Sequence, residues 1–108
     1  MSADFPETDW RQFKQVHARL LETFCTRILT ELAAVSQSSD GTAHDRYLRA
    51  YRLLQQRDQE MAEAFNDFRR STAELQLIIM LRMKLLTDED LNHFSEPTRN
   101  RVRAIAAL

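Results

Sequence analysis

The chain is almost free of residues that interrupt helices. Its 108 residues include one glycine, Gly41, and two prolines, Pro6 and Pro97. The tight turns of a β-rich fold depend on glycine and proline, because these residues supply backbone angles that others avoid. The sequence therefore predicts an all-α protein with few turns. Its length fits a single helical domain, residues 1–108.

Apolar residues recur at helical spacing before the glycine. This stripe predicts a helix over residues 9–37, in which Asp9 is the cap and Gln12, three residues later, reaches back. The stripe consists of Trp10, Phe13, Val16, Leu20, Phe24, Ile28, Leu32 and Val35. The small polar residues that follow, together with Gly41, predict a turn over residues 38–42.

A longer apolar pattern follows this turn. Its positions are spaced alternately by four and three residues, which is the spacing of a coiled-coil seam. The seam consists of Tyr47, Tyr51, Leu54, Asp58, Met61, Phe65, Phe68, Thr72, Leu75, Ile79, Arg82 and Leu86. It predicts a helix over residues 43–86 if that helix is continuous. Its internal polar members, Asp58 and Thr72, either pair with another group or mark where the packing partner changes. Thr87 and Ser95 then cap two short helices, expected over residues 88–94 and 96–107.

The expected architecture is a long antiparallel helical hairpin, coiled-coil-like, with two short C-terminal helices. Because the second helix is longer than the first, its segment 75–86 extends beyond its neighbour. Only Gln76, Arg82 and Lys84 are polar in this segment, and a helix that is apolar on all sides must be covered on all sides. We therefore expect a helical-bundle homodimer in which a second copy covers the segment. The expected interface consists of Leu77, Ile78, Leu81 and Leu85.

Two other arrangements would cover the same segment. In the first, Phe5 and the C-terminal helices fold over it within one chain, so that no second copy is needed there. In the second, a different protein takes the place of the second copy. All three arrangements bury the same apolar side chains, and they differ in the mass of the particle in solution.

Charge and cysteine content bear on partners and location. The formal net charge of −1 argues against general nucleic-acid binding, which needs a basic surface. The one cysteine, Cys25, cannot form an internal disulfide, which indicates a reducing compartment. The acidic N-terminal segment lacks the apolar stretch of a signal peptide, and no apolar run is long enough to span a bilayer. We expect a cytoplasmic protein that does not enter a membrane.

No motif in the sequence predicts catalysis, a cofactor or a metal site. Di-metal helical bundles need a glutamate three residues before a histidine, and none of the histidines has one. Glu89 and Asp90 have usable spacing to His93, but they lie in an acidic capping turn. A single glycine also excludes a glycine-rich loop for phosphate.

Isolated reactive side chains are expected to have structural roles. Cys25 lacks the basic neighbours that lower a thiol pKa, and His17 lies at the edge of the first apolar stripe, so both are expected to be packed. The acidic row Glu60, Glu63 and Asp67 is expected to face solvent, because catalytic carboxylates need enclosure.

Two groups of residues leave other functions open. Six arginines form a possible basic contact surface for a nucleic-acid-binding regulator, if a dimer brings their copies together. They are Arg46, Arg49 and Arg52 near the turn, and Arg99, Arg101 and Arg103 in the last helix. Large soft side chains could instead line a bundle cavity for a small ligand or metal sensor. These are Trp10, Phe24, Met61, Phe65, Phe68, Met80 and Met83.

The sequence favours a non-enzymatic helical interaction protein that acts as a scaffold, adaptor or regulator. It would work through helix–helix contacts, as a homodimer and with another protein as a further partner. The nucleic-acid regulator and the small-ligand or metal sensor remain alternatives.

Overall fold

The computed structural model describes residues 5–108. In chain order it contains α1 (Glu7–Gln37), α2 (Ala43–Met61), a π-helical turn (Ala62–Asn66), a 3-10 turn (Arg70–Thr72), α3 (Ala73–Arg82), α4 (Asp88–Leu91) and α5 (Glu96–Ala106). No strand occurs within these residues, which confirms the all-α class. The expected ranges 9–37, 88–94 and 96–107 overlap α1, α4 and α5.

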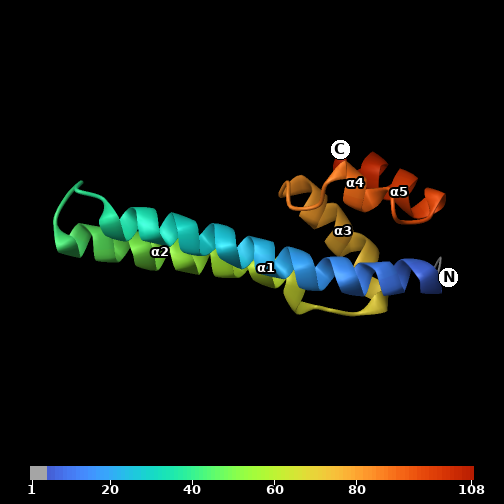
Figure 1. Cartoon of the computed structure of the whole chain (residues 1–108), viewed down its shortest axis with the longest axis horizontal. Helices are drawn as coiled ribbons and strands as arrows, with labels where there is room; N and C mark the ends of the chain where they lie inside the picture. Colours follow the sequence, from blue (N-terminus) through green and yellow to red (C-terminus); the bar gives the residue numbers. More distant parts are fainter. Residues whose placement is uncertain (1–4) are drawn as a thin grey trace.

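The molecule is elongated, with extents of 54 × 26 × 24 Å. Figure 1 shows α1 and α2 side by side, with their connecting turn at one end of the long axis and α3 to α5 gathered beside the other end of α1. The turn requires its glycine, because Gly41 has a φ of +76° and a Cβ there would lie 2.8 Å from Asp45 Oδ2. Thr42 and Asp45 then start α2 with a reciprocal capping box.

The range 43–86 is not one helix, because the chain leaves the α2 direction between Met61 and α3. Arg69, with φ −140° and ψ 154°, is extended. Side chains satisfy the carbonyl groups that this interruption frees. Thr72 Oγ1 and Gln76 Nε2 donate to the Asp67 carbonyl at 2.6 and 3.0 Å, and His17 Nε2 lies 3.1 Å from the Phe65 carbonyl oxygen.

The helix α3 also ends earlier than the expected Leu86. Lys84 adopts a φ of +60°, and its N–H donates to the Leu81 carbonyl while the Leu85 N–H donates to the Met80 carbonyl. This is the Schellman ending, in which a left-handed residue closes the last helical turn. The reversal directs Leu85 and Leu86 into the core, where both are buried.

Three polar contacts attach the C-terminal segment to α1. Arg27 Nη2 donates to the Lys84 carbonyl at 3.3 Å, Arg19 pairs with Asp90, and Asp9 binds Ser95 and Thr98. The contacts follow α1 from its middle towards its start as the chain proceeds from residue 84 to 98. This segment therefore runs alongside α1 in the opposite direction and closes a core at that end of the molecule.

The fold-back removes the reason for placing a homodimer interface on α3. Leu77, Ile78 and Leu85 are buried by other parts of the same chain, and Leu81 is half-buried. Phe5 is buried in the same core. Contacts within one chain cover most of this segment, as in the first of the two other arrangements, and leave Leu75 57% exposed. An interface with a second copy stays a prediction. The seam spacing continues through the bend, so the sequence pattern alone does not show it.

Asp9 caps a different helix from the one expected. The helix α1 begins after Pro6, and the Asp9 side chain, which is only 2% exposed, lies at the N-terminus of α5. Its Oδ1 accepts from the Ser95 N–H at 2.8 Å, and its Oδ2 accepts from the hydroxyls of Ser95 and Thr98, each at 2.6 Å. A carboxylate at a helix N-terminus is further stabilised by the helix dipole.

We predict that Asp9→Ala lowers the free energy of unfolding by about 2–3 kcal/mol, because it removes a cap and leaves buried donors without partners. Urea denaturation followed by circular dichroism measures this change. The matched control is Asp88→Ala, whose side chain is 83% exposed, and it should change the free energy by less than about 0.5 kcal/mol. Equal stability of Asp9→Ala and the control would contradict this role.

Candidate functional site

The half of the molecule that contains the interhelical turn has no core of its own. None of residues 29–61 is buried, and we call this part the arm. All buried residues lie in the rest of the described chain, residues 5–28 and 62–108, which we call the base. Figure 1 shows the arm as two helices that extend away from the base. Two helices alone cannot enclose a core, so the arm keeps apolar surface in contact with water.

The coiled-coil seam of α2 lies on the exposed surface of the arm. Tyr47, Tyr51 and Leu54 are 64, 54 and 44% exposed, and Leu29 of α1 is 62% exposed. We call these four residues the arm stripe. The seam spacing predicts a packed surface, whereas the structure leaves Tyr47, Tyr51 and Leu54 exposed. Such an apolar row is typical of a surface that meets another helix.

A groove lies beside the arm stripe, between α1 and α2. Its volume is about 270 Å³. It is lined by Cys25, Ile28 and Leu29 of α1 and by Leu54, Arg57, Asp58 and Met61 of α2. Its walls are mainly apolar, with Arg57 and Asp58 as the charged groups. The groove can accept an apolar side chain from a partner, and it offers no arrangement of polar groups for chemistry.

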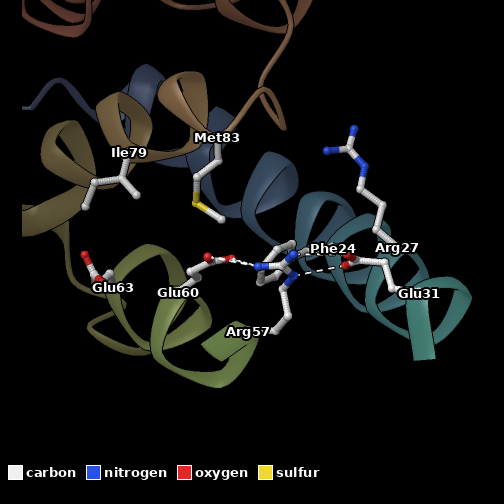
Figure 2. Close-up of a pocket in the computed structure, with 8 residues that line it drawn as sticks. All are labelled: Phe24, Arg27, Glu31, Arg57, Glu60, Glu63, Ile79 and Met83. Carbon is white, nitrogen blue, oxygen red and sulfur yellow. Dashed lines mark hydrogen bonds and ion pairs between the residues drawn. The ribbon is translucent and has the colours of Figure 1, made fainter. Parts of the chain in front are cut away.

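A second, larger cleft lies where α3 diverges from α1 and α2. Its volume is about 440 Å³, and Figure 2 shows the eight residues that line it. They are Phe24, Arg27, Glu31, Arg57, Glu60, Glu63, Ile79 and Met83. Ile79 and Met83 extend towards Glu60 of α2 and Glu63 of the π-helical turn, so the cleft has apolar and charged sides (Figure 2).

Arg57 holds the charged side of this cleft in place. Its Nε and Nη2 donate to the two carboxylate oxygens of Glu31, both at 3.0 Å, and its Nη1 donates to Glu60 at 3.1 and 3.2 Å. The paired contact to Glu31 joins α2 to α1 with the fork geometry that arginine makes with carboxylates. The hydrogen bond from Arg57 holds the pKa of Glu31 below its ordinary value.

The residues considered for catalysis or metal binding are used for packing. The His17 ring lies 4.3 Å from the Phe68 ring, centroid to centroid, and 5.2 Å from the Phe65 ring. Cys25 is half-buried beside the groove. Asp90 caps α4 through Thr87. Within residues 5–108, no group of three histidine, cysteine or acidic side chains is placed to hold a metal ion.

The large side chains considered for a ligand cavity do not line one space. Phe24 and Met83 line the larger cleft and Met61 lines the arm groove, while Phe65 and Met80 are buried in the core. The remaining two, Trp10 and Phe68, pack against each other with ring centroids 5.4 Å apart.

The two arginine groups lie far apart, and five of the six arginines bind the chain's own groups. The turn of the arm and α5 lie towards opposite ends of the molecule (Figure 1). Near the turn, Arg46 and Arg49 donate to the carbonyls of Gly41 and Asp40. In α5, Arg101 pairs with Glu74 at 2.8 Å. Arg99 donates to the Phe94 carbonyl and Arg103 to the Asn92 side chain. One chain therefore does not join them into a basic surface.

Comparison of the chain with protein-family models, with curated proteins and with solved structures gives no match. A search of residues 5–108 finds no helix with the length and apolar character that a membrane crossing requires.

We predict that Arg57→Met raises the pKa of Glu31 back towards its ordinary value of 4.5. Because the wild-type pKa is lowered in the folded state, the pair stabilises the fold fully above about pH 4.5, and this stabilisation is lost as the pH falls through the lowered value. Carboxyl-carbon NMR titration measures the change. The control is Glu7, whose pKa is lowered by Arg11 and Arg70 and should not move. An unchanged pKa of Glu31 in the variant would contradict the assignment.

Proposed function

We propose that this is a non-enzymatic helical interaction protein, a scaffold, adaptor or regulator, whose arm is the docking surface. The observation that carries the proposal is that none of residues 29–61 is buried, although this range contains the apolar seam of α2. An apolar seam in contact with water is costly, since burying one large side chain contributes about 1.5–3 kcal/mol. A partner helix that covers the arm stripe would recover this free energy.

The base has a different role in this proposal. It supplies the buried core that folds the chain and holds the first part of α1 in place. The helix α1 passes without interruption from the base into the arm. The base can therefore present the arm as a rigid projection, in the form of an antiparallel, coiled-coil-like hairpin.

The proposal keeps the cytoplasm as the location and moves the contact surface from α3 to the arm. A second copy, as expected from the sequence, and a different protein are the two candidate partners of this surface. Leu77 and Ile78 are buried, whereas Leu29 and Leu54 are accessible to a second helix pair.

The two alternative functions, a nucleic-acid regulator and a ligand sensor, have less support. Five of the six arginines that a nucleic-acid regulator would use are engaged with groups of the same chain. A ligand sensor would need a more enclosed cavity than the open groove and cleft.

We predict that Leu29→Glu lowers the recovery of the proteins that are captured from native cells together with the tagged full chain. The lost contact should reduce their recovery by about tenfold or more, because burying a charge in place of a leucine abolishes the apolar gain. The matched control is Leu75→Glu on α3, because Leu75 is 57% exposed and lies outside the arm. Quantitative mass spectrometry of the captured proteins gives the readout. Equal recovery with wild type and Leu29→Glu would refute the arm as the docking surface.

A further inference from the structure

We infer that the partner of the arm is a second copy of this chain, and that the two arms pack antiparallel, with the turn of each beside the base end of the other. The result is a two-fold four-helix bundle built from two hairpins. This inference rests on the proposed function, and it adds the identity of the occupant and the orientation in which it binds.

The arm carries both halves of a self-complementary contact. In a two-fold interface the same surface meets itself, so it must contain projections and a hollow that receives them. Leu29 and Leu54 project from the arm, where they are 62 and 44% exposed. The same two residues border the apolar groove of about 270 Å³. A leucine of one copy can therefore enter the groove of the other, which is the knobs-into-holes contact that the seam spacing predicts.

The size of the arm is sufficient for a dimer. The 19 residues of α2 form a helix about 28 Å long at a rise of 1.5 Å per residue. Two helices side by side are about 20 Å wide, so the face covers about 560 Å² on each copy, or about 1,100 Å² in total. This area is near the lower limit for specific protein interfaces. Interfaces at this limit are typical of weak or transient complexes, so we expect a reversible dimer that forms at micromolar concentrations.

Charge along the arm favours the antiparallel orientation. Residues 38–52, at the turn, contain three arginines and two aspartates. The part of the arm towards the base, residues 29–33 and 53–61, contains one arginine and three acidic residues, Glu31, Asp58 and Glu60. Antiparallel arms place the more basic part of each copy beside the more acidic part of the other, whereas parallel arms would place like charges together.

Arg52 and Asp58 are the charges that report on this orientation. Arg52 follows Tyr51 of the arm stripe, and Asp58 lines the groove. Both are exposed, and neither makes an ion pair or side-chain hydrogen bond with residues 5–108. In an antiparallel pair centred near Leu54, Arg52 of one copy lies near Asp58 of the other. Each dimer would contain this pairing twice.

The first test measures the mass of the purified full chain by sedimentation equilibrium from about 1 to 200 µM, a range that spans micromolar association. Wild type and Leu75→Glu should both shift from monomer to dimer. Leu29→Glu should remain monomeric with unchanged helix content by circular dichroism.

Alkylation of Cys25, the one cysteine, gives a second readout of the same dimer. Because Cys25 borders the groove, its reaction with N-ethylmaleimide should slow several-fold as wild type dimerises. Monomeric wild type across the range, or dimeric Leu29→Glu, would overturn the inference.

The second test exchanges the two charges. Arg52→Glu and Asp58→Lys should each raise the dissociation constant by about fivefold, because each places like charges together twice per dimer. The double variant should regain the wild-type value to within about twofold, since the pair is restored with its signs reversed. Additive weakening in the double variant would overturn the antiparallel orientation.

The outcomes separate this inference from the proposed function. Monomeric wild type that still loses captured proteins on Leu29→Glu would overturn the second copy and support the arm as a docking surface for another protein. A dimer that forms through the arm, with captured proteins unaffected by Leu29→Glu, would support the pairing of arms and refute the arm as the surface for those proteins.

Discussion

The interruption between α2 and α3 is the feature on which the rest of the structure depends. Where a helix is interrupted, its last carbonyl groups lose their helical N–H donors. They must be satisfied in another way, because an unpaired buried carbonyl is costly. Here Thr72 and Gln76 donate to the Asp67 carbonyl, and His17 faces the Phe65 carbonyl. The Phe68 ring packs between Trp10 and His17. These contacts make the break a defined conformation that attaches the chain to α1.

The fold-back concentrates the buried apolar surface at one end of the molecule. Because α3 leaves the direction of α2, its apolar sides meet α5 and the π-helical turn, and its buried residues share one core with those of α1. Asp9 then fixes the start of α5, and Arg19 and Arg27 fix the segment before it. These contacts bury the apolar side chains of the base and hold its helices together. The helices α1 and α2 continue beyond the base as a pair. The apolar residues that remain in the arm are therefore available for contacts with other chains.

The sequence predicts the helical class, the first helix and its turn because these depend on local signals. The spacing of Phe13, Val16 and Leu20 and the position of Gly41 act over a few residues. The break is harder to predict, because the seam spacing continues through it. Asn66, Asp67, Ser71 and Thr72 are weak helix formers and are the one local signal for it. The choice between bending and continuing depends on contacts with Trp10 and His17, which lie 48 or more residues away in the chain.

The sequence does not locate the exposed apolar surface of the molecule. The seam spacing predicts packed positions, and the structure leaves Tyr47, Tyr51 and Leu54 of the seam exposed. An interface on Leu77, Ile78, Leu81 and Leu85 is expected if residues 43–86 form one straight helix. In the bent chain, Leu77, Ile78 and Leu85 are buried and Leu81 is half-buried. The contact of Asp9 with Ser95 and Thr98 had no signal in the sequence, because capping across 86 residues depends on tertiary structure.

Hydrogen–deuterium exchange within α1 tests most directly the claim that one uninterrupted helix joins a packed base to an arm without a core. At about 1 µM protein, the amides of residues 29–37 should exchange about 100-fold faster than those of residues 13–24, because only the latter are held by buried contacts. Uniform protection along α1 at this concentration would contradict the division of the molecule into base and arm.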